Sequence, residues 1–216
     1  MKSHRQQRGI SMVEVLAAIA IIVILAALLF PATKFVLGKN NQTAALVQMR
    51  QIGVAFTLYA GENDFRLPNR QKDSSFDKWP RLLAKYLGDD IRVYAAPGDP
   101  NNYLNLGTDP LDNSHNHTSF IMNGYNDLGG FTDDVEVRLT RMDASDVILL
   151  GTPRSGSTHF YMDMLEGKTG NHLDVLNLAA YGDGSNYLFA DGSARFITKH
   201  DYHPEMWLVD KSFQVP

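Results

Sequence analysis

The chain has 216 residues, of which 44% are hydrophobic, and its 20 Lys and Arg against 24 Asp and Glu give a formal net charge of −4. This composition excludes a disordered, collagen-like or strongly basic nucleic-acid-binding protein, so we expect no nucleic-acid partner. Because the sequence contains no cysteine, disulfides, thiolate zinc sites and a cysteine nucleophile are excluded too, and the core alone must hold the fold.

A basic leader precedes a long apolar run at the N-terminus. Residues 1–9 contain three basic residues and no acidic one, whereas Val15 to Thr33 are nineteen residues without a formal charge. A helix of this length spans about 28 Å, close to the hydrocarbon core of a bilayer. The positive flank predicts a single transmembrane helix over residues 10–33, with the leader in the cytoplasm and the rest of the chain on the far side.

An ordinary secretory signal or an uncleaved anchor is the alternative interpretation of this segment. The apolar run is longer than the hydrophobic region of a usual signal peptide. Glu14 lies near its start, and Gly9, the small residue that could mark cleavage, precedes the run instead of following it. These three features favour a different kind of N-terminal signal.

The stretch from Arg8 to Glu14, RGISMVE, resembles the N-terminal signature of type IV prepilins and type II secretion pseudopilins. The resemblance implies that a prepilin peptidase cuts between Gly9 and Ile10 and then methylates the new N-terminus at Ile10. It further implies a non-enzymatic structural subunit without a cofactor, which enters a pilus-like or pseudopilus filament. The partners would be other pilin or pseudopilin subunits, the inner-membrane assembly machinery and the lipid bilayer, with the head outside the cytoplasm.

Glu14 is the candidate assembly residue. An unpaired carboxylate at the edge of an apolar span costs a few kcal/mol, so it needs a partner. Cleavage before Ile10 would create one, because the new α-amino group is positively charged and can pair with Glu14 of a neighbouring subunit in a helical bundle. The alternative is that Glu14 extends to the lipid headgroups or is protonated.

Pro31 is the candidate kink in the apolar helix. It has no N–H to donate to the carbonyl of Ala27, so we expect the helix to bend or loosen there. In pilins, a proline at this place accompanies helix loosening within the filament, and the resemblance implies the same for Pro31. The alternative is that Pro31 only marks the membrane exit.

Residues 34–62 are expected to continue the helix as an amphipathic segment. One face carries apolar residues at helical spacing, and we expect them in the core. A single helix is thus predicted from Ser11 to about Ala60, with Gly61 as its stop signal. The apolar positions are Ala45, Met49, Ile52, Phe56 and Tyr59, and polar residues elsewhere around the helix are Gln42, Gln48, Arg50 and Gln51.

Residues 63–216 are expected to form a globular head. A short amphipathic helix is predicted over 79–87, and the Gly-, Asn- and Asp-rich stretches 98–117 and 151–170 are typical of long surface loops. Asp191-Gly192 signals a type I′ hairpin. The predicted fold class is α+β and pilin-like, with the long helix packed on a small antiparallel sheet. The predicted strands are 119–122, 135–139, 147–150, 187–190 and 194–198.

Four pieces of the head resemble a broad group of pseudopilin-like proteins, although loosely. They are residues 59–68, 79–87, 119–123 and 186–192. Two positions depart from that group. Tyr181 stands where a His often precedes the last motif by ten residues, and Ala96-Pro97-Gly98-Asp99 stands where Cys-Pro-x-Asp is frequent.

A membrane-anchored enzyme or ligand-binding head is the alternative function. Residues 151–158, GTPRSGST, follow a predicted strand and resemble the loop that binds the 5′-phosphosulfate in sulfotransferases. Such a loop needs a helix after it, but Gly167 and Gly170 interrupt the following segment. A surface loop is therefore the expected structure.

Metal binding is only weakly indicated. Histidines and acids recur in short range, but no set completes a known ligand pattern. Calcium held by head loops remains possible through Asp183 and Asp191, although neither has the spacing of a known calcium loop. We assign no metal ligand and no catalytic residue. The pairs considered are His115 with His117, His172 with Asp174, and His200 and Asp201 with His203.

Overall fold

The computed structural model divides by its internal contacts into two units, Met1–Asn40 and Asn41–Pro216, which share one helix. The structure describes residues 11–68, 78–107, 118–125, 136–157, 159–162, 164 and 172–212, but within them not the side chains of residues 28, 30–32, 34, 35, 105, 106 and 141.

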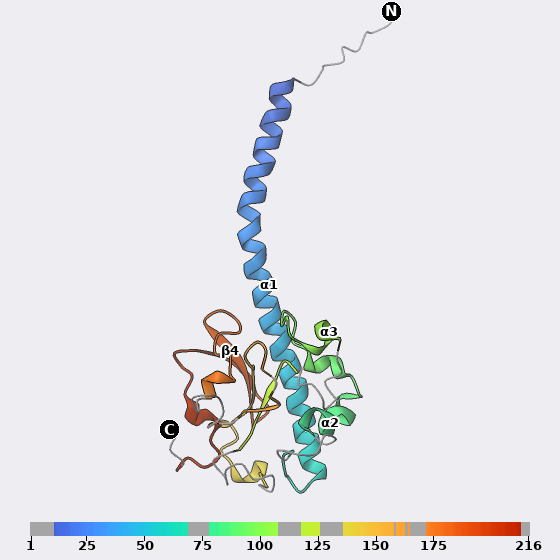
Figure 1. The fold of residues 1–216 in the computed structure, drawn as a ribbon, viewed down its shortest axis with the longest axis vertical. Helices are drawn as coiled ribbons and strands as arrows, with labels where there is room; N and C mark the ends of the chain where they lie inside the picture. The colour runs from blue at the N-terminus through green and yellow to red at the C-terminus, as the bar shows by residue number, and fades with distance from the viewer. Residues whose placement is uncertain are drawn as a thin grey trace, which may run out of the picture. The chain divides into compact units, whose positions relative to one another are not determined.

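The long helix α1 covers Met12–Glu62 without interruption (Figure 1), which confirms the predicted helix. Its end differs in detail from the prediction. Gly61 lies within the last turn, and Asp64 takes the left-handed conformation that terminates the helix, at φ 53°. The N–H of Phe65 donates to the carbonyl of Ala60 over 2.8 Å, which is the bond of a Schellman motif.

The head half of α1 is buried along the predicted apolar stripe. Ala45, Met49 and Ile52 are fully buried and Phe56 is 1% exposed, so this face forms part of the head core. Tyr59 is half-buried. Gln42 departs from the prediction because it is also buried, and its carbonyl accepts a hydrogen bond of 2.8 Å from Asn186 Nδ2.

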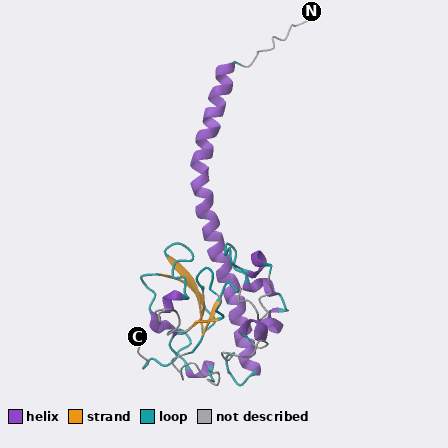
Figure 2. Cartoon of the chain, viewed as in Figure 1, coloured by secondary structure: helices purple, strands orange, loops and turns teal. Residues whose placement is uncertain are grey.

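The head contains a sheet, drawn in orange in Figure 2. Its five strands have the order β3-β1-β2-β4-β5. The predicted α+β, pilin-like layout is therefore confirmed, but the sheet is mixed instead of antiparallel. β1 and β3 pair in parallel, because β2 reverses the chain once and the return to the outer side of β1 reverses it again. The strands are β1 Ile121–Asn123, β2 Ile148–Gly151, β3 Tyr161–Met162, β4 Gly184–Phe189 and β5 Ala194–Thr198.

One predicted strand is wrong. Of residues 135–139, the first lies outside the described residues, and Leu139 already begins the 3-10 helix η4, Leu139–Arg141. Residue Arg138 makes only an isolated bridge to Arg66. The backbone of this segment instead pairs with the chain that leaves α1, since the N–H of Leu67 donates to the carbonyl of Val137 over 2.8 Å.

The loops contain more regular structure than their composition suggests. β3 forms inside the predicted loop 151–170, and helix α3, Tyr103–Leu106, forms inside the predicted loop 98–117, whose residues 108–117 lie outside the described part. The predicted helix over 79–87 is confirmed as α2 with the 3-10 turn η1. The remaining elements are α2 Trp79–Ala84, η1 Lys85–Leu87, η2 Ile91–Tyr94, η5 His172–Asp174 and η6 Pro204–Trp207.

The sheet is buried on both faces, because successive strand residues alternate between two core clusters. Leu188 belongs to the cluster that includes α1 and α2, whereas its neighbours Tyr187 and Phe189 belong to the cluster that includes Trp207 of η6. On the α1 side, the rings of Phe56 and Trp79 stack with their centroids 6.1 Å apart. The two faces explain how β1 to β4 remain fully buried, whereas the edge strand β5 is buried only at Ala194.

The β4–β5 hairpin is confirmed, but its turn type differs from the prediction. Gly192 has φ 80°, whereas Asp191 is not among the described residues with positive φ, so the turn is not type I′. The N–H of Gly192 donates to the carbonyl of Phe189, and the N–H of Phe189 donates to the carbonyl of Ser193, each over 2.9 Å. These bonds indicate a three-residue loop with glycine at the left-handed position.

We predict that Gly192→Val destabilises the head by roughly 1–3 kcal/mol, because a β-branched residue is strained at this φ. No atom lies within 4 Å of the added Cβ, so crowding does not contribute. Ser193→Val is the control and should change stability by less than about 0.5 kcal/mol. Denaturant unfolding of both purified variants measures the difference, and equal losses would contradict this hairpin geometry.

Candidate functional site

The N-terminal site begins where the described residues begin. Gly9 and Ile10 lie outside them, so the processing residues stay predictions. Ser11 caps α1: its Oγ accepts from the N–H of Val13 over 3.3 Å, and its own N–H donates to Glu14 Oε2 over 2.8 Å. The bond to Glu14 is one half of a capping box, which the Ser-x-x-Glu spacing signals, whereas the Oγ caps the N2 N–H of Val13 instead of the N3 N–H. Glu14 therefore has a hydrogen-bond partner within its own chain. The prediction from the sequence named only a partner on a neighbouring subunit.

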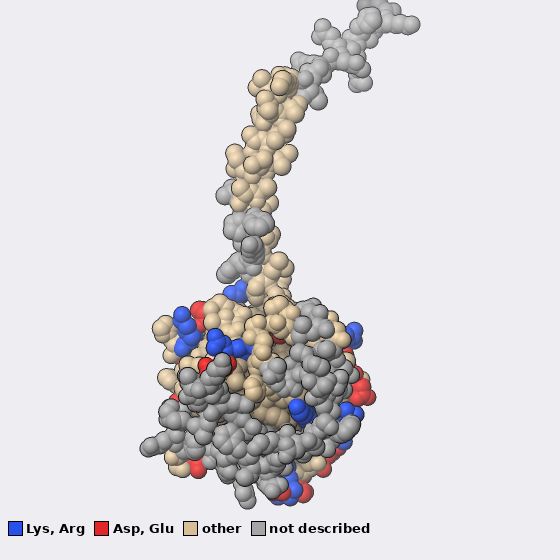
Figure 3. Space-filling model, viewed as in Figure 1, with Lys and Arg blue, Asp and Glu red and all other residues tan. Residues whose placement is uncertain are grey.

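The N-terminal part of α1 presents a large apolar surface. Over most of this part, Figure 3 shows no acidic or basic side chain on the visible face. A patch of this size is uncommon on a soluble monomer and marks contact with lipid or with other protein. The side chains that are more than half exposed are Met12, Val13, Leu16, Ile19, Ile21, Ile22, Val23, Ile24, Leu25, Leu29, Val36 and Leu37.

Among the residues that the structure describes, no helix combines the length and the hydrophobicity that crossing a bilayer requires. α1 is assigned as one helix across position 31, so a proline is accommodated there without a break in the helix. The role of Pro31 in loosening the helix stays a prediction.

A pocket of about 110 Å³ in the head collects segments that the sequence analysis singled out. One wall is formed by residues 96 and 98–101, which include the Ala96-to-Asp99 stretch except for Pro97. A second wall combines Thr152, Pro153 and Ser155, from the phosphate-loop-like segment, with Tyr181. Both positions at which the head departs from the pseudopilin-like group, Ala96 and Tyr181, therefore line the same pocket.

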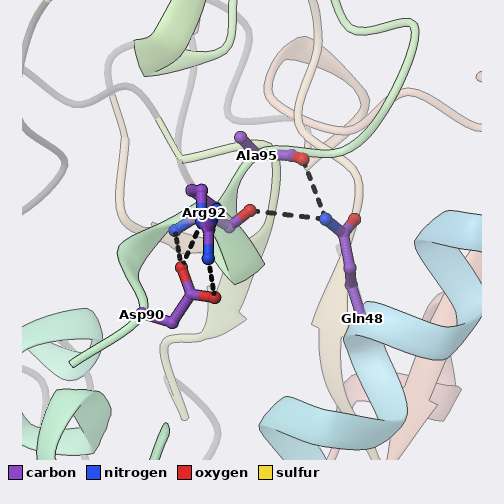
Figure 4. A network of polar contacts seen from close by, with 4 residues as sticks. All are labelled: Gln48, Asp90, Arg92 and Ala95. Atoms are coloured by element: carbon purple, nitrogen blue, oxygen red, sulfur yellow. Dashed lines mark hydrogen bonds and ion pairs between the residues drawn. The ribbon is translucent and has the colours of Figure 1, made fainter. Parts of the chain in front are cut away.

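Helix α1 positions the first wall of this pocket through Gln48 (Figure 4). Gln48 Nε2 donates to the carbonyl of Ala95 over 3.0 Å and to that of Arg92 over 3.4 Å. The guanidinium of Arg92 in turn donates to both carboxylate oxygens of Asp90, over 2.7 and 2.8 Å. The Gln48 bonds fix the backbone that leads directly into Ala96. The bonds from Arg92 hold the pKa of Asp90 below its usual value.

Asp99 and Tyr181 give the pocket its electrostatic character. Asp99 accepts hydrogen bonds from the backbone N–H of Asn101 over 2.9 Å and from Ser119 Oγ over 2.6 Å. Burial raises the pKa of Tyr181 to about 12, and the negative charge of Asp99 adds to this shift. The Tyr181 phenol is therefore a neutral hydrogen-bond donor at physiological pH. Sequence patterns did not connect these residues, because only the fold brings their segments together.

The phosphate-loop interpretation of residues 151–158 is wrong in its geometry. After the described part of the loop, the next described element is strand β3 instead of a helix, so the helix that a phosphate loop needs does not follow among the described residues. The N–H of Arg154 donates to the carbonyl of Val175 over 2.8 Å, and Arg154 Nη1 donates to that of Leu173 over 3.3 Å. The basic residue thus serves the packing of the loop.

The metal candidates do not converge within the described part of the chain. His115 and His117 lie outside it, and no group of three His, Cys, Asp or Glu side chains that could hold a metal is present among the described residues. Asp191 Oδ2 instead accepts from Arg195 over 3.0 Å. The backbone carbonyl of Asp183 accepts from Lys199 over 2.9 Å. Calcium binding stays an untested possibility.

His172 is the one histidine of the candidate pairs that the fold buries, among those described. Its side chain is 7% exposed, its Nε2 has no hydrogen-bond partner in the described structure, and its ring lies 6.1 Å from that of Tyr202. Burial lowers the pKa of His172, and the charge of Glu205 opposes this shift only in part. The imidazole is thus kept neutral in the fold.

Comparison with protein families matches residues 4–30 to the prokaryotic N-terminal methylation motif. The chain therefore carries the prepilin-type signature, and the assignment to the pilin-like and pseudopilin-like proteins is consistent with it. Comparisons with curated proteins and with solved structures found no match to the chain.

We predict that His172 makes the head less stable in mild acid. Because its pKa in the folded state lies below the unfolded value of about 6.5, the unfolded chain binds the proton more readily. The neutral His172 contributes fully to the stability of the head above about pH 6.5, and this stability is lost as the pH falls below that value. Thermal unfolding at about pH 7.5 and about pH 5 should show a smaller acid loss for His172→Gln than for the wild type.

His200→Gln is the matched control, since His200 is exposed. Its acid loss should equal that of the wild type. An acid loss that His172→Gln leaves unchanged would show that this buried imidazole does not titrate with unfolding.

Proposed function

We propose that the chain is a structural, non-enzymatic subunit of a type IV pilus-like or type II secretion pseudopilus filament. The single observation that carries the proposal is the methylation motif at residues 4–30, which runs directly into a long helix with exposed apolar side chains. A prepilin peptidase would cut between Gly9 and Ile10 and methylate Ile10. The partners would be other pilin or pseudopilin subunits and the inner-membrane assembly machinery.

Before assembly, the N-terminal part of α1 would anchor the subunit in the inner membrane by a single pass. The sequence from Val15 to Thr33 carries no formal charge. The run includes positions 28 and 30–32, whose side chains the structure does not describe. Exposed apolar side chains on many sides of the helix suit a lipid environment. The basic leader would favour an N-terminus in the cytoplasm and a head outside it.

In the filament, Glu14 would pair with the α-amino group of Ile10 on a neighbouring subunit. The hydrogen bond from the Ser11 N–H uses one oxygen of the carboxylate, and an ionised carboxylate offers about four acceptor positions. The cap therefore holds the side chain at the helix start while it remains able to accept an ammonium group. Capping and pairing are thus separate roles of one residue, and different variants can separate them.

We predict that Glu14→Leu and Glu14→Gln both abolish assembly while cleavage and membrane insertion survive. Each change leaves the Ile10 amine buried without a counter-charge, at a cost of about 3–5 kcal/mol for each contact. Gln keeps an acceptor for the capping box, so Glu14→Gln removes the charge alone. The measurement is the amount of pelletable filament, after mass spectrometry has established a methylated Ile10 at the N-terminus.

Ser11→Ala is the complementary control, because it removes the Oγ cap and retains the charge of Glu14. It should loosen the first helical turn by about 1 kcal/mol and leave assembly nearly intact. Normal filaments from processed Glu14→Gln would contradict the pairing. A mature wild-type chain with an intact Met1, or one cut well after Phe30, would contradict the filament proposal itself.

A further inference from the structure

The head pocket has the size of a small-ligand site. Its volume is about 110 Å³, and a single water needs about 10–15 Å³ on this measure, so the space exceeds what one or two waters require. Four separate parts of the head line it: residues 96 and 98–101 after η2, Ser119 before β1, residues 152, 153 and 155 after β2, and residues 177, 180 and 181 before β4. Because the walls belong to different elements, the fold holds their relative positions.

Several polar groups of the lining are held in place by hydrogen bonds to their own neighbours, whereas Thr152 Oγ1 is buried without a hydrogen-bond partner in the described structure. Asn101 Nδ2 donates to Ser155 Oγ over 2.6 Å and so links the two walls. Asp99 is oriented by Asn101 and Ser119, as described above. On the far side, the N–H of Asn177 donates to the carbonyl of Thr152 over 2.9 Å. A ligand would therefore meet groups that are already ordered, which lowers the entropic cost of binding.

The charge of the lining selects against ions. None of the described residues that line the pocket is Lys, Arg or His, and the carboxylate of Asp99 would repel phosphate or sulfate. A calcium ion needs six to eight oxygen ligands, usually with several carboxylates, but Asp99 is the only carboxylate of this lining, and it already accepts two hydrogen bonds. An ammonium group would find no second carboxylate beside Asp99 among the described lining residues.

A neutral, hydroxyl-rich molecule suits what is left. The lining offers acceptors in Asp99 and the amide oxygens, and donors in the hydroxyls of Ser155 and Tyr181, so each ligand hydroxyl can both donate and accept. The aromatic ring of Tyr181 adds an apolar surface for C–H groups. We propose that this pocket binds a single sugar ring, with Asp99 and Tyr181 as its main hydrogen-bonding residues. The inference goes beyond the filament role and does not depend on it.

The test uses the purified full chain, unassembled, in a detergent without a sugar headgroup. Saturation-transfer NMR and calorimetric titration measure binding of glucose, galactose, mannose and N-acetylglucosamine, with calcium chloride, methylammonium chloride and inorganic phosphate as comparison probes. We expect saturable, millimolar binding of at least one sugar and no binding of the three ions. Tyr181→Phe, which removes one hydroxyl and keeps the ring, should weaken sugar binding about fivefold to tenfold.

Tyr86→Phe is the matched control, because it removes a hydroxyl that bonds Glu62, a residue outside the lining of the pocket. It should bind sugar as the wild type does. The proposal is overturned if no sugar shows saturable binding, if Tyr181→Phe binds sugar unchanged, or if only an ion binds. Because the subunits are unassembled in this experiment, a failure of the filament proposal would leave its result unaffected.

Discussion

The head depends on the close approach of α1 to the β4–β5 hairpin at Gly53. A Cβ at this position would lie 2.9 Å from Leu188 Cδ1 and 3.4 Å from the carbonyl oxygen of Gly192. Leu188 is fully buried, so it has little freedom to move away. The missing side chain of Gly53 lets the helix backbone reach the sheet, and the buried stripe of α1 then covers one face of the strands.

This contact gives one helix two different surroundings. From Ala45 onward, α1 supplies core residues to the head and, through Gln48, holds the segment that leads into the pocket. Toward its start, it exposes apolar side chains that suit a bilayer or a bundle of neighbouring helices. The assembly that we propose for the N-terminal part of α1 and the sugar binding that we propose for the head would therefore use different residues. A head tied to the helix core would keep its pocket formed whether the subunit lies in the membrane or in a filament.

Periodic patterns predicted the helix and its buried stripe because helical burial repeats every three to four residues over a long segment. Asp191-Gly192 likewise located the hairpin, although not its turn type. The sequence could not reveal β3, because two residues carry no periodic signal, or the parallel pairing that depends on it. The pocket also escaped prediction, since Asp99 and Tyr181 are distant in sequence and meet only through the fold. At the N-terminus, the motif indicated the class of protein, and the Ser-x-x-Glu spacing was an available signal for the cap by Ser11.

The close approach of α1 to the sheet at Gly53 is tested most directly by comparing the unfolding free energies of Gly53→Leu and Gly61→Leu in the purified chain. Both glycines lie in the head half of α1, but no atom lies within 4 Å of a Cβ added at Gly61. If the helix backbone must reach the sheet, Gly53→Leu should destabilise the head by about 3 kcal/mol or more. Gly61→Leu should be neutral or stabilising by up to about 1 kcal/mol. Equal effects of the two substitutions would contradict the claim that α1 is built into the head core at Gly53.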